Sequence, residues 1–138
     1  MSNPTVQQKI ETIAAYMGGR WKCIKLNKRA TWRYYMSDNT LDWVKHPDHL
    51  AYNKDWNRLM GVVERISKTP LLEADGTPCT DPQDVCHPTT WGMPTEDGKR
   101  YMVRFKGSVI AYGDTLIEAV FEACYDFIEW DNKLKNNG

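Results

Sequence analysis

The last third of the chain constrains its fold most strongly, because Arg100–Trp130 predicts two short strands, a tight turn and a long helix in one run. Lys99–Lys106 and Ser108–Tyr112 are the strand segments, and Gly107 lies at the turn between them. The helix that follows has a broad apolar face made of Ile117, Val120, Phe121, Cys124, Phe127 and Ile128. Such a helix needs a sheet or another helix to cover that face.

The first half of the chain predicts the same alternation of helix and hairpin. A helix is expected from about Thr5 to Met17, and Gly18 and Gly19 end it. Strands are expected at Arg20–Leu26 and Ala30–Met36, since the connection between them is of hairpin length. A second helix is expected at about Lys54–Ser67. Its apolar stripe is Trp56, Leu59, Met60, Val63 and Ile66.

Two connections lack a periodic pattern. Ser37–Asn53 is polar with scattered aromatic residues, and residues 71–98 hold four of the seven prolines and predict a long irregular loop or an insertion. The predicted order is therefore helix, hairpin, helix, loop, hairpin, helix. We predict an α+β fold in which an antiparallel sheet of about four strands packs with three helices, in a single domain spanning residues 1–138.

The charged residues are balanced overall but segregated along the chain. Eighteen basic and eighteen acidic residues cancel, which excludes a global positive field of the kind that attracts nucleic acid or anionic lipid. The segment from Arg20 to Arg33 nevertheless carries six basic residues and no acidic one, whereas Glu118 to Asp131 carries five acidic residues and no basic one. These segments can attract each other within the fold or between copies, so a homodimer is possible.

The N-terminal sequence lacks the basic flank, apolar run and cleavage site of a secretory signal, and no apolar stretch approaches the length of a membrane span. We expect a cytoplasmic protein without a membrane partner. In that compartment the four cysteines are expected to be reduced unless they bind metal.

Chemistry-bearing residue types gather in the irregular connections. Cys79, Cys86 and His87 are weak candidates for metal ligands, with His46 and His49 in another loop, but their spacing matches no common zinc pattern. A Cys86–His87 nucleophile pair would need an orienting group and an oxyanion site that the sequence does not indicate.

Two carboxylate pairs, Asp81 with Asp84 and Glu118 with Glu122, are explained better by solvated surfaces than by acid–base chemistry. Phosphate-loop, dinucleotide-binding and zinc-protease motifs are absent from the sequence. We therefore predict no catalytic residue, no metal and no cofactor.

Aromatic residues are the more informative excess, with six Trp and seven Tyr in the chain. Several lie among Lys and Arg, a mixture suited to anchoring a protein partner or stacking on bases. The candidate binding residues are Arg20, Trp21, Lys22, Trp32, Arg33, Trp43 and Arg104. The competing interpretation, favoured by the strand preference for aromatic residues, is that they pack against helices. The binding hypothesis instead predicts an exposed aromatic patch near Trp32 and Trp43.

Two blocks, YNKDWNRLMGVVERI from Tyr52 to Ile66 and DTLIEAVFEACYDFIEW from Asp114 to Trp130, resemble the paired signatures of the phage α/β/α (ABA) sandwich domain family. These are small uncharacterised proteins of phages and prophages of Bacteroides-type bacteria. IAAYMGG, from Ile13 to Gly19, is similar to their opening helix. Gly61 replaces a frequent proline, Asp131 replaces an aromatic, and the 71–98 loop is longer than usual. The resemblance implies a phage or prophage accessory protein of the bacterial host cytosol and supplies no catalytic residue.

A second stretch, GDTLIEA from Gly113 to Ala119, is similar to the antitoxin domain that neutralises small RNA-cleaving toxins. That domain usually accompanies a DNA-binding segment, and none follows Lys135, so sequence-specific nucleic-acid binding is not supported. We interpret this likeness as shared strand–strand–helix architecture.

These features favour a non-enzymatic binding module for a host or phage protein. The alternative is an anti-defence protein that binds or sequesters a small nucleotide signal, with Arg20, Lys22, Arg33 and Arg104 lining a basic pocket. An antitoxin-like module and an enzyme of unknown class are the remaining hypotheses.

Overall fold

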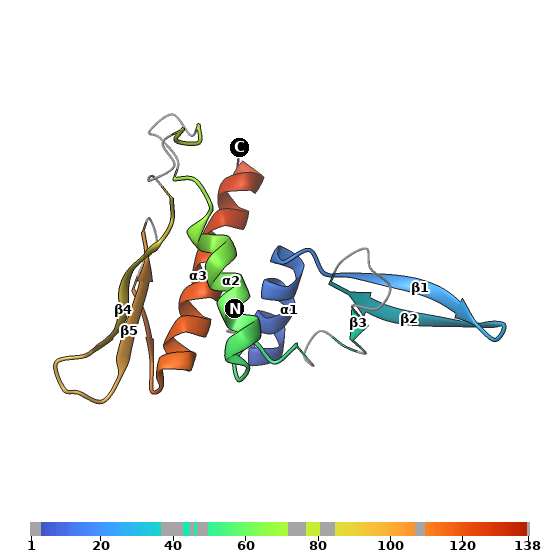
Figure 1. Cartoon of the computed structure of the whole chain (residues 1–138), viewed down its shortest axis with the longest axis horizontal. Helices are drawn as coiled ribbons and strands as arrows, with labels where there is room; N and C mark the ends of the chain where they lie inside the picture. Colours follow the sequence, from blue (N-terminus) through green and yellow to red (C-terminus); the bar gives the residue numbers. More distant parts are fainter. Residues whose placement is uncertain are drawn as a thin grey trace. The chain divides into compact units, whose positions relative to one another are not determined.

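Helices and antiparallel strands alternate along the chain, which confirms the predicted α+β class (Figure 1). The computed structural model describes residues 4–36, 43–44, 46, 50–71, 77–80, 85–106 and 110–137. Its strands form two three-stranded sheets, β1-β2-β3 and β4-β5-β6. The chain divides into two compact units, Met1–Arg58 and Leu59–Gly138.

The first unit opens with helix α1, Val6–Tyr16, which begins at a reciprocal cap. The Gln8 backbone N–H donates to Thr5 Oγ1, and the Thr5 backbone N–H donates to Gln8 Oε1, so two of the otherwise unpaired donors at the helix start are satisfied. The buried residues of α1 are Ile10, Ile13 and Ala14. The predicted helix is confirmed to within one residue at each end.

A long hairpin follows, built from β1, Arg20–Leu26, and β2, Arg29–Tyr35, which pair in register over all seven residues of each strand. The two-residue loop is Asn27-Lys28, and both residues have positive φ, as a twist-matched hairpin loop requires. The short strand β3, Trp43–Val44, pairs with Tyr34 and Tyr35 of β2.

Helix α2, Trp56–Ser67, begins where Asp55 Oδ1 accepts hydrogen bonds from the backbone N–H groups of Asn57 and Arg58. Its buried side chains are Leu59, Val62, Val63 and Ile66. The predicted stripe was therefore partly wrong: Trp56 and Met60 are exposed and Val62 is buried. A spacing of three, four and seven residues places the buried set on one face, whereas Met60 lies about 100° around the helix from Leu59.

In the second unit, helix α3, Leu116–Asn137, contacts β5, Tyr101–Phe105, and β6, Ala111–Gly113 (Figure 1). Val103, Phe105 and Ala111 point to the covered side of the sheet and are buried. The helix contributes the larger share of this core, through Ala119, Val120, Phe121, Ala123, Cys124, Phe127 and Ile128. The Phe105 and Phe127 rings lie 6.1 Å apart in this core.

The region predicted as an irregular loop, 71–98, contains strand β4, Pro88–Pro94, so this part of the prediction was wrong. Two register shifts interrupt the pairing of β4 with β5, and Gly92 has a φ of 73°. Prolines at both ends and a bulge in the middle hide the two-residue alternation by which a strand is recognised. The strands also form two sheets in place of the single sheet of about four strands that we predicted.

None of the helices that the structure describes has the length and apolar composition needed to cross a membrane.

Adding one methyl group at the junction of β6 and α3 should lower the free energy of unfolding by a measurable amount. A Cβ at Gly113 would lie 2.3 Å from the backbone nitrogen of Ala119, and a helix backbone cannot move aside cheaply. We expect Gly113→Ala to lower the free energy of unfolding by about 2–3 kcal/mol in denaturant titrations. The control is Gly98→Ala, where nothing lies within 4 Å and only the φ of 69° opposes the change. A cost of about 1 kcal/mol is expected there, and equal losses at both sites would contradict the close approach.

Candidate functional site

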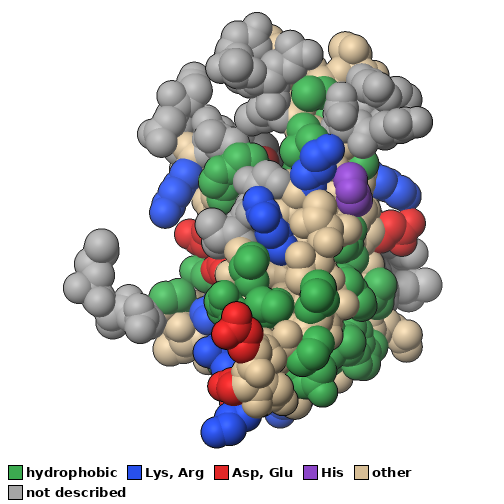
Figure 2. Space-filling view, turned by 90° about the vertical axis from the view of Figure 1, so that its left-hand side faces the viewer, with side chains coloured by type: hydrophobic (Ala, Val, Ile, Leu, Met, Phe, Trp, Pro, Cys, Tyr) green, Lys and Arg blue, Asp and Glu red, His purple; other side chains and the backbone are tan. Residues whose placement is uncertain are grey.

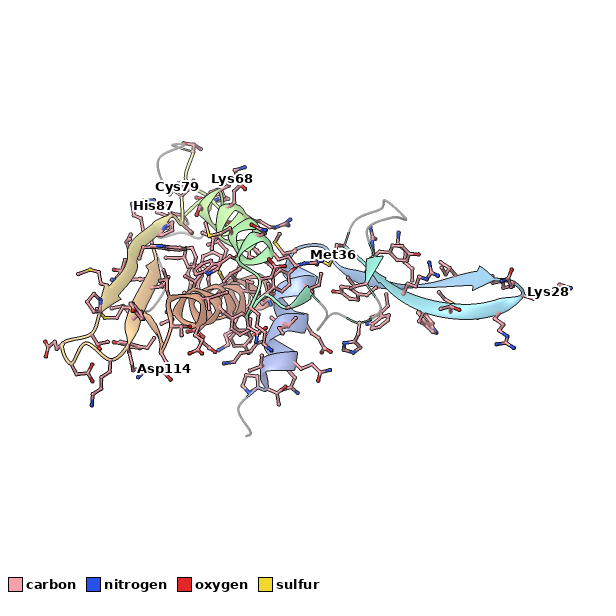
Figure 3. All side chains as sticks on the ribbon, turned by 60° about the horizontal axis from the view of Figure 1, so that its bottom comes forward. Lys28, Met36, Lys68, Cys79, His87 and Asp114 are labelled. Carbon is pink, nitrogen blue, oxygen red and sulfur yellow. The ribbon has the colours of Figure 1, made fainter. Side chains whose placement is uncertain are left out.

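The β1–β2 hairpin has two chemically different faces, because residues paired across the ladder project their side chains to the same side. One side, the aromatic face, carries Trp21, Cys23, Lys25, Ala30, Trp32 and Tyr34. The other, the basic face, carries Arg20, Lys22, Ile24, Arg29, Thr31, Arg33 and Tyr35. Figure 3 shows side chains along both faces between Met36 and Lys28, which lies at the tip.

The outer part of this hairpin buries little on either face. Residues 29–32 of β2 are all exposed, and the Trp32 side chain retains 63% of its accessible surface. On β1, Cys23 and Lys25 are exposed and Ile24 is half-buried. An isolated two-stranded ribbon is marginally stable in water. The ribbon must therefore be anchored at its base.

The anchor is a cluster of rings on the aromatic face. Trp21 packs edge-on against Tyr34 with ring centroids 5.4 Å apart, and His46 lies on Trp21 at 5.8 Å. His46 Nε2 lies 3.8 Å from Glu11 Oε1, which connects the cluster to α1. Tyr34 is only 5% exposed. We call Trp21, Tyr34, His46 and Glu11 the base cluster.

Gly19 allows the base cluster to close. A Cβ at this position would lie 2.3–2.6 Å from atoms of the Tyr34 ring, too close for any side chain without displacing the ring. Gly19 therefore has a role beyond ending α1, since the absence of a side chain there leaves room for the Tyr34 ring.

The base of the basic face is also ordered by an aromatic ring. Tyr35 is 2% exposed, and the Lys22 ammonium lies 5.4 Å from its ring centroid. This distance suits a cation–π interaction. Two of the predicted basic residues, Lys22 and Arg33, lie opposite each other in the ladder and so face the same side.

The hairpin thus brings together five of the seven predicted binding residues: Arg20, Trp21, Lys22, Trp32 and Arg33. Trp43 lies opposite Tyr35 in the backbone pairing of β3, and its side chain lies outside the described residues. Arg104 is exposed on β5 of the second unit, in the other sheet.

The described cysteine and histidine candidates do not form an arrangement typical of a metal site. Cys86 is buried, and burial, followed by the negative charge of Asp131, raises the pKa of its thiol. His87 is exposed, and its Nδ1 lies 3.1 Å from the Val85 carbonyl oxygen. In the described parts of the chain, no three His, Cys, Asp or Glu side chains converge in a way that could hold a metal ion. His49, Asp81 and Asp84 lie outside the described residues.

Glu118, one of the carboxylates considered for acid–base chemistry, caps α3. Its backbone N–H donates to Thr115 Oγ1, and its Oε2 accepts from the Asp114 backbone N–H. A carboxylate in the first turn also compensates the positive end of the helix dipole. These contacts give Glu118 a structural role.

A second exposed surface was not predicted from the sequence. Met93 and Met102 are paired across β4 and β5, and Met102 and Tyr112 across β5 and β6, so these three side chains share the outer face of the sheet. Met93 is 57% and Tyr112 42% exposed. Figure 2 views the side where β4 and β5 lie in Figure 1, and it shows hydrophobic side chains gathered there. The sequence pattern that could have indicated this surface is the alternation of Met102 and Arg104 with the buried Val103 and Phe105.

Comparisons with protein-family models, with curated proteins and with solved structures find no match to this chain. The resemblance to phage proteins stays a prediction.

The base cluster predicts how stability falls in alkali. Burial, and to a smaller extent the negative charge of Glu11, raises the pKa of the Tyr34 phenol above its ordinary value. The folded protein therefore keeps this proton at pH values where the unfolded chain releases it. The stability linked to this proton is complete below the ordinary phenol pKa of about 10 and is lost as the pH rises through and above that value.

We expect Tyr34→Phe to make the melting temperature less sensitive to pH between about 9 and 11 than that of the wild type. Tyr101→Phe, at an exposed tyrosine, is the matched control and should leave the wild-type pH profile unchanged. Identical profiles for Tyr34→Phe and the wild type would contradict the burial of this phenol.

The loop at the hairpin tip predicts a stabilising substitution. Lys28 has a φ of 67°, a conformation that disfavours any residue with a Cβ. We expect Lys28→Gly to stabilise the hairpin against local opening by about 0.5–1 kcal/mol, measured from hydrogen-exchange protection of its amides. Arg29→Gly, one residue further and within β2, should reduce protection instead. Equal effects at both positions would rule out this loop conformation.

Proposed function

We propose that this chain is a non-enzymatic binding module and that the β1–β2 hairpin is its binding element for a protein partner. One observation carries the proposal: Trp32 is 63% exposed on a strand whose neighbouring residues 29–31 are exposed as well. An exposed indole contributes nothing to the hydrophobic core. A seven-residue strand whose outer residues bury so little side-chain surface is therefore unusual in a monomer.

The composition of the hairpin fits a protein interface. Trp, Tyr and Arg are the residue types that contribute most to binding energy at protein interfaces. The segment Arg20–Arg33 adds six basic residues without an acidic one, which favours a partner with an acidic surface. The base cluster holds one end of the hairpin in place, so less conformational freedom is lost on binding.

The nucleotide-signal alternative has less support from the geometry. Small-ligand sites are concave and bury most of the ligand. Of the four residues predicted to line such a pocket, Arg20 is exposed, Lys22 and Arg33 are half-buried on the hairpin, and Arg104 is exposed in the other sheet. A phage or prophage role in the cytosol of a bacterial host remains part of the proposal and is supported only by the resemblance of the two sequence blocks.

The proposal predicts that Trp32 is needed for partner capture. Immobilised protein should enrich specific proteins from a bacterial host extract, and Trp32→Ala should lose that enrichment while keeping the melting temperature of the wild type. Trp91→Ala removes another exposed tryptophan, on β4, and should capture the same proteins as the wild type. Failure to enrich any protein, or equal capture by all three proteins, would overturn the proposal.

A further inference from the structure

The outer edge of β2, next to β3, is paired over only part of its length among the residues that the structure describes. Described pairs join β3 to Tyr34 and Tyr35. In the same described residues, Arg29–Trp32 of β2 has strand pairing on one side, with β1. This stretch of edge, which we call the β2 slot, is in line with β3 and long enough for a four-residue strand.

The backbone of the β2 slot presents hydrogen-bonding groups outward. Hydrogen-bonded and non-hydrogen-bonded pairs alternate along an antiparallel ladder, and a two-residue loop is closed by a hydrogen-bonded pair, here Leu26 with Arg29. Alternation then directs the N–H and C=O groups of Ala30 and Trp32 away from β1. Unpaired groups of this kind are the template to which an added strand binds.

The side chains that flank the slot specify what kind of strand would fit. Ala30 and Trp32 belong to the aromatic face, whereas Arg29 and Thr31 belong to the basic face. Successive side chains of an added strand also alternate between the two faces. One half of them would lie beside the Trp32 indole and the other half beside Arg29.

We propose that the β2 slot binds an extended peptide segment of the protein partner, in which acidic residues alternate with apolar ones, as an added antiparallel strand. This inference rests on the proposed function and names the chemistry of the partner. The acidic residues lie on the basic face and the apolar residues on the aromatic face. β3 is the precedent, since it already pairs antiparallel with the same edge.

The other edge of the hairpin is a poorer template. By the same alternation, the outward-directed positions of β1 are Trp21, Cys23 and Lys25. Lysine on an edge strand is a common device against pairing with another chain. In the β2 slot, by contrast, the outward-directed positions are Ala30, which leaves room for a neighbour, and Trp32, which offers apolar surface.

The test compares two peptides and two variants by calorimetric titration of the full chain. The probe is a synthetic peptide of about nine residues with alternating Glu and Val, and its control has the same composition with all Glu residues in one block. Ala30→Pro removes the outward N–H but leaves the bonds to β1 in place, because Ala30 does not donate to β1. Ala30→Val changes the same site and keeps the N–H.

We expect the alternating peptide to bind the wild type and Ala30→Val, and to bind Ala30→Pro about tenfold more weakly. The block peptide should bind about tenfold more weakly than the alternating one. Equal affinity for Ala30→Pro and Ala30→Val would overturn strand addition. Oligothymidylate that binds the hairpin as tightly as the alternating peptide would also overturn it, because the hairpin would then be recognising charge alone.

A charge-exchange variant provides a second test that stays valid if Ala30→Pro disturbs the fold of the hairpin. Arg29→Glu should weaken binding of the Glu–Val peptide and strengthen binding of a Lys–Val peptide by a similar factor. If the two affinities do not change in opposite directions, the proposed pairing of acidic residues with the basic face is wrong. If Trp32→Ala loses partner capture from host extract while Ala30→Pro keeps it, the proposed function stands and strand addition fails.

Discussion

Edge-on packing of Trp21 against Tyr34, over a glycine that leaves room for the ring, is the interaction on which the hairpin depends. A two-stranded ribbon cannot maintain itself in water without burying part of one face. The base cluster supplies that burial at one end, where Tyr34 and Tyr35 are the only buried residues of β2. His46 and Glu11 extend the cluster to helix α1, so the base of the hairpin is connected to this helix within the first unit.

Beyond the base cluster, residues 29–32 of β2 are exposed. The register of β1 with β2 separates the mixed aromatic and basic residues of the hairpin into an aromatic face and a basic face. In the part of the chain that the structure describes, β1 is the strand that pairs with residues 29–32, and their outer edge faces away from it. These three features are the ones by which an extended segment of another protein is recognised: apolar contact, charge and main-chain hydrogen bonds.

The sequence predicted the parts of this structure that depend on local patterns. The three helices, the β1–β2 hairpin and the strand–strand–helix order of the last third followed from periodicity and from glycine positions. β4 was missed because prolines and a bulge obscure its alternation. The aromatic–basic mixture on the hairpin was predicted with two interpretations, an exposed patch near Trp32 and Trp43 or packing against helices, because periodicity cannot show whether a strand face is covered. Trp32 is exposed, and the Trp43 side chain lies outside the described residues. Trp56 was assigned to the core for the same reason and is exposed.

Residue-resolved hydrogen exchange of the free protein tests the central claim most directly, because neighbouring amides of β2 should behave oppositely. The account predicts measurable protection at Thr31 and Arg33, whose N–H groups face β1, and rapid exchange at Ala30 and Trp32, whose N–H groups face the open edge. Equal protection at all four amides would contradict it, since the edge of β2 would then already be occupied.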